Sequence, residues 1–211
     1  MDILIIGAGG HGKVVLEILR AARTHMPVGF LDADPALANT TLGNLPVFGP
    51  LNLLPKIKGK AKAAIVAIGD NRARQGYAQK LGDAGLELIT AVHPSATIAS
   101  TARVGRNVVI AAGAIVGTEA VIADSAIINT GALIDHECHI GEAAHVAPGV
   151  AMAGRVRVGT GAFVGLGARI IQCLSIGEWS TIGAGAVVIR DIPANTTAVG
   201  VPARVIKHAA E

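Results

Sequence analysis

Residues 128–152 read INTGALIDHECHIGEAAHVAPGVAM, and Ile, Val or Met returns at every sixth position of this stretch. The same spacing holds from Val92 to Val188, and the fourth residue after each aliphatic one is small or modest, most often Ala. A period of six matches neither the 3.6 of an amphipathic helix nor the two of a plain strand. Each unit is therefore expected to be a short strand followed by a corner.

Three such units close a triangular coil of about 18 residues, and stacked coils form a parallel β-helix. One large and one small inward side chain per face fill a narrow prism, and glycines after the aliphatic residue are expected to relieve the corners. An aromatic content of 2% agrees, because rings would overfill this cross-section. The repeat predicts about five to six coils. Counting from inward Ile134, we expect Cys138 to return to the core, His136 to project from a flat face, and His139 to be a solvated corner residue.

The first ninety residues follow a different pattern. Buried strands are expected at 3–6, 28–31 and 63–68, helices at 13–23 and from 71 to about 81, and a short strand near 88–90. This order predicts an α/β domain of the half-Rossmann type. The predicted domains are residues 1–91, of the half-Rossmann type, and residues 92–211, a β-helix with a C-terminal tail.

Glycines at positions 7, 9 and 12 match the dinucleotide-binding fingerprint, and Asp32 stands where a ribose-binding acid is expected. The domain is only half a dinucleotide fold, which makes a dehydrogenase the weakest alternative. A glycine-rich turn before a helix still forms an anion site suited to the phosphates of one nucleotide. A tight turn without a ligand is the other interpretation, and His11, which has no evident packing role, favours the ligand.

Composition excludes several classes of function. The chain has 18 basic and 15 acidic residues, no Lys/Arg run and only five aromatic residues, so no nucleic-acid partner is expected. No apolar stretch reaches the roughly 18 residues of a membrane span and no basic leader precedes the first strand, so no membrane insertion is expected. Two cysteines offer no disulfide framework. We expect a cytoplasmic protein.

Two motifs together resemble a known family. A half-Rossmann domain with Gly9-Gly10-His11-Gly12, joined to a β-helix containing the segment 134–141 (IDHECHIG), resembles the bacterial sugar-nucleotide N-acetyltransferases of the bacillosamine and perosamine pathways and the related sialic acid O-acetyltransferase group. The similarity extends to Gly200-Val201-Pro202-Ala203-Arg204 near the end. It implies a left-handed β-helix, a homotrimer, and acetyl-CoA held between neighbouring prisms. No metal is expected.

The resemblance also assigns roles to residues. It implies His136 as general base with Glu137 as its acidic partner, and Cys138 and Cys173 are poor candidates for a nucleophile. The implied residues are Gly9, Gly10, His11, Asp32, Gly69 and Asn129 for the substrate, and His145, Leu166 and Ala184 for acetyl-CoA. Leu166 replaces an isoleucine and Ala184 a glycine of the bacillosamine enzyme, while Ala33 stands where a second acid is found. Arg204 either reaches a coenzyme phosphate or is solvated.

The expected activity is direct acetyl transfer from acetyl-CoA to the amino group of a UDP- or GDP-linked deoxy-amino sugar. Loss of a proton from the attacking amine requires a positioned base, which a His–Glu pair supplies. An O-acetyltransferase acting on sialic acid or another glycan hydroxyl would use the same base. A non-catalytic solenoid remains a further alternative. Zinc hydration, as in the γ-class carbonic anhydrases, requires histidines on successive coils, and positions 118 and 154 hold Thr and Gly.

Overall fold

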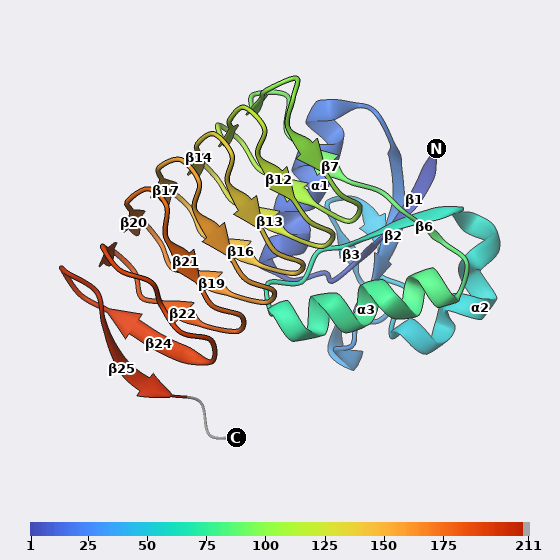
Figure 1. Ribbon diagram of the computed structural model, residues 1–211. Coiled ribbons are helices and arrows are strands. Elements are labelled where there is room, and N and C mark those ends of the chain that lie inside the picture. Colours follow the sequence, from blue (N-terminus) through green and yellow to red (C-terminus); the bar gives the residue numbers. More distant parts are fainter. Residues whose placement is uncertain (209–211) are drawn as a thin grey trace. The chain divides into compact units, whose positions relative to one another are not determined.

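The computed structural model describes residues 1–208, with the side chains of residues 56–58 excepted. The chain forms two compact units, Met1–Pro94 and Ser95–Glu211 (Figure 1). Unit 1 carries the helices and a short parallel sheet, and unit 2 is a stack of coils.

Unit 1 is built on a parallel sheet with the strand order β2-β1-β5-β6, which confirms the predicted Rossmann-like domain. The strands are β1 (Asp2–Ile6), β2 (Met26–Leu31), β5 (Ala63–Val66) and β6 (Glu87–Leu88). The connecting helices are α1 (Gly10–Ala22), η1 (Pro35–Leu37), η2 (Leu51–Leu53), α2 (Leu54–Ile57), η3 (Lys58–Lys60) and α3 (Asn71–Asp83). A hairpin of β3 (Thr41–Leu42) and β4 (Leu45–Pro46) lies between β2 and β5 in the chain, and β7 (Ala91–Val92) is the last strand of the unit.

Helix α1 begins at Gly10, three residues before the predicted start at Lys13, so His11 lies in the first turn of the helix. Sequence patterning missed this turn because its two glycines carry no apolar signal. A Cβ on Gly12 would overlap the carbonyl oxygen of Gly7, so a glycine is required where the strand-to-helix turn closes on itself. The turn is therefore tighter than the sequence pattern indicated.

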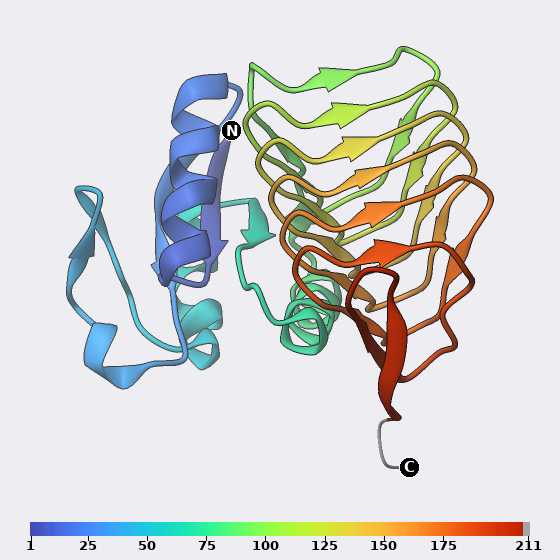
Figure 2. The same cartoon turned by 90° about the vertical axis from the view of Figure 1, so that its left-hand side faces the viewer.

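Unit 2 is a parallel β-solenoid whose coils stack along one axis (Figure 2). Its strands are two residues long except in the last coil, and they form three faces. The first face contains β10 (Val109–Ile110), β13 (Ile127–Ile128), β16 (His145–Val146), β19 (Phe163–Val164), β22 (Thr181–Ile182), β24 (Thr196–Val199) and the antiparallel β25 (Arg204–His208). The second contains β8 (Thr97–Ile98), β11 (Ile115–Val116), β14 (Leu133–Ile134), β17 (Ala151–Met152), β20 (Arg169–Ile170) and β23 (Val187–Val188). The third contains β9 (Arg103–Val104), β12 (Val121–Ile122), β15 (His139–Ile140), β18 (Arg157–Val158) and β21 (Ser175–Ile176).

The register confirms the three-sided coil. Ile115 pairs with Leu133, and Leu133 pairs with Ala151, so each coil advances by 18 residues. Every sixth residue from Ile110 to Val188 is at most 3% exposed, whereas the first three members of the series are half-buried. The aliphatic period therefore forms the core of the prism.

The glycines that follow the aliphatic residues have a different function from the one predicted. The left-handed backbone recurs at every sixth residue from Asn107 to Gly185, at corner positions that Glu, Ser, Arg and Trp also occupy. Gly117, by contrast, has no left-handed φ, and a Cβ there would lie 2.8 Å from the carbonyl carbon of Asp135 on the next coil. These glycines provide clearance between stacked coils, and the expectation that they relieve corners is wrong.

Candidate active site

His136 and Glu137 occupy the corner between β14 on the second face and β15 on the third. The predicted flat-face position of His136 is therefore wrong, and so is the corner position of His139, which lies on strand β15. The period identifies inward residues. Because each six-residue unit contains both a two-residue strand and a turn, the period does not tell which outward residues lie on the strand and which lie at the corner. Both placements leave His136 outward, and Cys138 is fully buried as expected.

The two side chains form a hydrogen-bonded pair. Nδ1 of His136 lies 2.9 Å from Oε2 of Glu137, and the same oxygen accepts a hydrogen bond from Nε of Arg155 at 3.1 Å. The backbone N–H of His136 donates to Oδ1 of Asp135 at 2.7 Å. The side chains of His136 and Glu137 are 48% and 44% exposed, so the pair is open to solvent.

The charges of this corner keep the carboxylate ionised. The hydrogen bond from Arg155, and then that from His136, hold the pKa of Glu137 below its ordinary value. Burial raises the pKa of the Cys138 thiol, which makes it a weak nucleophile at neutral pH. The corner is therefore suited to proton transfer, and Cys138 is not suited to forming a covalent intermediate.

A second group of predicted residues lies along the corner between the first and second faces. Asn129 follows β13, Leu166 follows β19 and Ala184 follows β22, and both Leu166 and Ala184 are exposed. His145 lies on β16, with Nε2 3.1 Å from the amide nitrogen of Asn129 and its ring edge-on to Phe163 at 5.2 Å. The resemblance assigns Asn129 to the substrate and His145 to acetyl-CoA, and the structure places these two side chains in contact.

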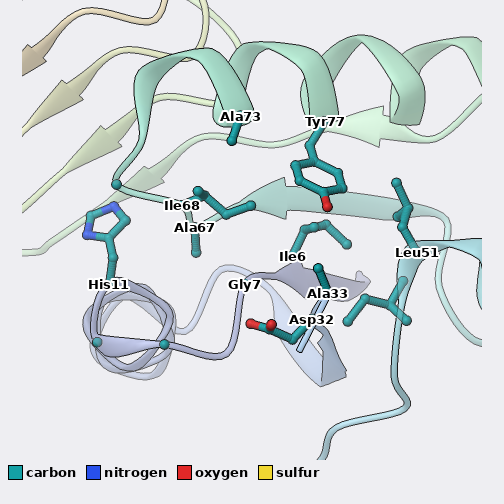
Figure 3. A pocket seen from close by; sticks show the side chains of 14 residues that line it. Ile6, Gly7, His11, Asp32, Ala33, Leu51, Ala67, Ile68, Ala73 and Tyr77 are labelled. Atoms are coloured by element: carbon teal, nitrogen blue, oxygen red, sulfur yellow. The ribbon is translucent and has the colours of Figure 1, made fainter. Parts of the chain in front are cut away.

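Unit 1 contains a pocket of about 420 Å³ at the carboxyl ends of β1, β2 and β5 (Figure 3). All five predicted substrate residues of this unit line it, which are Gly9, Gly10, His11, Asp32 and Gly69. The N-terminus of α1 opens here, and its N-cap residue, Gly9, offers no side-chain cap for the first N–H groups. An anion can therefore take the place of the cap.

Asp32 fixes the glycine-rich turn in addition to lining the pocket. Its Oδ2 accepts the backbone N–H of Ala8 at 2.6 Å, and its Oδ1 accepts that of Asp34 at 2.9 Å. The side chain of Asp34 instead caps helix η1 by accepting the N–H of Ala36, and Ala33 lines the pocket. The replacement of the second acid by Ala33 therefore leaves a smaller and less polar wall.

His11 faces the pocket as a neutral imidazole. Burial, and to a smaller extent the charge of Arg74, lower the pKa of His11 to about 4. Arg74 is itself fully buried, and its guanidinium donates to the carbonyl oxygens of Ile68 and Gly69 and to the side chain of Asn71 at 2.8–3.1 Å. Burial lowers the pKa of Arg74 to about 10, against the charge of Asp70. Arg74 thereby fixes the β5–α3 loop that forms one wall of the pocket.

Sequence reasoning missed four residues of these sites. Tyr77 and Leu51 line the nucleotide-sized pocket, with the hydroxyl of Tyr77 directed into it (Figure 3). Arg74 and Arg155 hold the surrounding groups in place. Tyr77 and Arg74 lie on helix α3, whose polar sequence gives little periodic signal. Arg155 stands 18 residues after Glu137, and the coil length could have identified it.

The described part of the chain lacks two further features. Among residues 1–208, no three His, Cys, Asp or Glu side chains are grouped as a metal site would require. None of the helices in this range is long and apolar enough to cross a membrane.

The sequence profile of the PglD N-terminal domain matches residues 2–81. Over almost the whole chain, the fold superposes on crystallographic PerB from Caulobacter crescentus in complex with CoA and GDP-perosamine, with a TM-score of 0.93, 43% identity and 98% of each chain covered. The chain belongs to the bacterial sugar-nucleotide N-acetyltransferase family. The predicted family, the left-handed β-helix and the acyltransferase class are thereby confirmed.

Two other members of the family extend the comparison. The acetyltransferase domain of PglB from Neisseria gonorrhoeae FA1090, in complex with acetyl coenzyme A, has a TM-score of 0.90 at 34% identity, covering 97% of this chain and 98% of that one. UDP-N-acetylbacillosamine N-acetyltransferase from Bacillus subtilis (strain 168) is 37% identical over 113 residues, which are 53% of this chain. The matched segment spans about half (51%) of that curated relative. CoA or acetyl-CoA in both structures confirms the predicted co-substrate of the family.

Proposed function

We propose that this chain transfers the acetyl group of acetyl-CoA to the amino group of a nucleotide-linked deoxy-amino sugar, with His136 as the general base. The observation that carries the proposal is the accessible His136–Glu137 pair, in a chain that aligns over 98% of its length with an enzyme bound to CoA and GDP-perosamine. The Bacillus subtilis relative is named for a UDP-linked sugar, and PerB binds GDP-perosamine. The substrate class is therefore an amino sugar on a nucleoside diphosphate.

The pair gives His136 the tautomer that the reaction needs. The Glu137 carboxylate accepts a hydrogen bond from Nδ1–H, so Nε2 carries the lone pair. The sugar amine attacks the thioester carbonyl, and Nε2 takes the amine proton as the C–N bond forms. The C–S bond then breaks, and the thiolate leaves with the proton returned from the imidazolium. A positioned base of this kind contributes about 10² to 10⁴ in rate.

The pocket of unit 1 suits the nucleoside diphosphate. The uncapped N-terminus of α1 directs backbone N–H groups and a positive dipole end at a phosphate. Because His11 is neutral at pH 7, it contributes a hydrogen bond and not a full charge. Asp32 fixes the glycine-rich turn, and its remaining lone pairs can accept a hydrogen bond from a ribose hydroxyl.

We propose a homotrimer in which each site is shared. Within one chain, the His136 corner and the Asn129–His145 group lie on different edges of the prism. A neighbouring copy that brings its first-to-second corner to the His136 corner would unite the base with the coenzyme-binding residues Leu166 and Ala184. The exposed apolar residues Ile115 and Leu133 on the second face support contact with such a copy.

We propose the cytoplasm as the compartment. Cys138 and Cys173 are both free thiols, as in proteins of reducing compartments.

The proposal is tested by thiol release from acetyl-CoA against UDP-, GDP- and dTDP-linked 3- and 4-amino sugars and their hydroxyl analogues. We expect one preferred amine acceptor, and a loss of at least about 100-fold in kcat for His136→Ala. His208→Ala, which removes an exposed imidazole from β25, is the matched control and should retain full turnover. Near-full turnover of His136→Ala, or preference for a hydroxyl acceptor, would overturn the assignment.

A further inference from the structure

The corner one coil after the His136–Glu137 pair touches that pair at three points. This corner consists of Gly154 and Arg155, between β17 and β18. The backbone N–H of Arg155 donates to the carbonyl oxygen of His136 at 2.9 Å, and its Nε donates to Glu137 at 3.1 Å. The third point is the face of the imidazole, which lies against Gly154. The active pair therefore rests on a second corner of the solenoid.

The placement of the His136 imidazole leaves no room for a side chain at Gly154. A Cβ at this position would lie 2.9 Å from Cδ2 of His136 and would overlap Nε2 and Cε1. The backbone does not require glycine, since the φ of Gly154 is not left-handed. Thr118 and Gln172, which stand one coil before His136 and one coil after Gly154, show that this column of corners accepts side chains. The three atoms nearest to a Cβ at position 154 all belong to the imidazole, so the ring is the closest obstacle to a side chain there.

Arg155 acts on the carboxylate. Its Nε shares Oε2 of Glu137 with the imidazole, so the carboxylate is held between a guanidinium and the ring. The side chains of Arg155 and Glu137 are 62% and 44% exposed, and exposed ion pairs add little stability. The contact therefore matters because it orients the Glu137 carboxylate and because Arg155 and His136 share its negative charge.

Other charged groups surround this carboxylate. A pocket of about 460 Å³ beside it is lined by Glu119, His139, Arg157 and Cys173 in addition to Glu137 and Arg155. Asp135 lies on the other side of His136, where it binds the backbone N–H. Arg155 is the residue of this pocket that pairs with the Glu137 carboxylate, so its removal changes the His136–Glu137 pair most directly.

We propose that Gly154 and Arg155 are positioning residues for acetyl transfer: Gly154 leaves room for the imidazole to lie with Nε2 uncovered, and Arg155 fixes the Glu137 carboxylate that orients Nδ1. The proposal rests on the proposed function for its kinetic consequences. Its structural content, the tautomer and placement of the ring, is independent of any substrate.

Gly154→Ala is the first test. We expect kcat to fall at least about 10-fold, because the methyl group displaces the ring and covers Nε2, while the melting temperature stays within about 2 °C. Gly82→Ala is the matched control, since a methyl group on Gly82 of α3 would have no neighbouring atom within 4 Å and the variant should keep full activity. Retention of activity within twofold by a folded Gly154→Ala would overturn the role of Gly154.

Arg155→Gln is the second test. Without the guanidinium, the Glu137 carboxylate interacts with the His136 ring alone, and one cation near the ring is lost. Both changes favour protonated His136, so the acid limb of the kcat/KM profile should move up by about half a pH unit, with kcat several-fold lower. Arg155→Lys restores the cation and should return the limb towards the wild-type position. An unmoved limb in Arg155→Gln would overturn the role of Arg155, since a purely structural role predicts that result.

A measurement of which ring nitrogens of His136 carry protons distinguishes a failure of the positioning roles from a failure of the proposed function. Long-range ¹⁵N–¹H spectra of the substrate-free protein should show the Nδ1–H form in the wild type, a mixture with Nε2–H in Gly154→Ala, and a larger share of the doubly protonated ring at the same pH in Arg155→Gln. If no acceptor is acetylated but the spectra change as expected, the proposed function fails and the positioning roles stand. If both variants keep the wild-type spectrum, the positioning roles fail whatever the activity.

Discussion

The solenoid and the N-terminal unit hold their functional groups by opposite means. In the solenoid every position recurs once per coil, the core is a repeated pair of inward side chains, and the His136–Glu137 pair is exposed at a corner. In unit 1 each element occurs once, His11 is half-buried and Arg74 is fully buried. In a repeating fold, a residue that departs from its column is thus a candidate for function. Gly154 and His136 are both of this kind.

The electrostatics of the two regions differ in the same sense. The solenoid corner keeps Glu137 ionised by contacts with two cationic or potentially cationic groups in a solvated setting. Unit 1 keeps His11 neutral by removing it from water beside a buried guanidinium. The first arrangement suits proton transfer, and the second suits fixed hydrogen bonds to a bound nucleotide.

The largest effect is expected from the solenoid core. Ile176→Ala, at an inward position that is 2% exposed, should lower the free energy of unfolding by about 2–5 kcal/mol, because the narrow prism cannot collapse around the cavity. Urea unfolding measures this change. Ser175→Ala, at the exposed neighbouring position of the same strand β21, is the control and should cost less than about 0.5 kcal/mol. Equal effects at both positions would contradict the division into inward and outward residues.

A medium effect is expected in the pocket of unit 1. Asp32→Ala removes the acceptor for the N–H groups of Ala8 and Asp34, so the glycine-rich turn loses its shape. The KM for the nucleotide sugar should rise by about 10- to 100-fold, in line with the loss of charged hydrogen bonds, while the KM for acetyl-CoA stays within twofold. Asp34→Ala, which alters only the cap of η1, should leave both constants near wild type. A rise in the acetyl-CoA constant alone would show that the two regions are not functionally separate.

The smallest effect concerns pH. His11 has a folded pKa of about 4 against 6.5 for the free side chain, so its contribution to stability is full above pH 6.5 and is lost as the pH falls towards 4. Between pH 7.5 and 5.5 the loss should be about 1 kcal/mol, measured by hydrogen exchange in β1 and β5. His11→Asn should abolish this dependence. The solenoid strands should show none from this source, and an equal loss in both units would point to a different titrating group.

The sequence predicted the fold because the six-residue period is redundant over many coils, and it predicted the half-Rossmann unit because strands 3–6 and 63–68 are continuous apolar runs. It misplaced His136 and His139, since the period distinguishes inside from outside but not strand from corner. Tyr77, which lines the pocket, and Arg74, which is buried against the β5–α3 loop, escaped prediction because both lie on a polar helix, where burial depends on tertiary packing. Arg155 lies one coil length after Glu137, whereas the position one coil length after His136 is Gly154, which carries no chemical signal.

The left-handed backbone of Glu137, with φ at 56°, sets stability against activity at one residue. Glycine or asparagine would occupy this conformation with less strain, whereas an ordinary side chain costs roughly 1 kcal/mol there. Substitution of Glu137 by glycine or asparagine should therefore stabilise the coil and at the same time remove the hydrogen-bond partner of the imidazole. Under the proposed mechanism, the side chain at position 137 therefore serves proton transfer and does not stabilise its own turn.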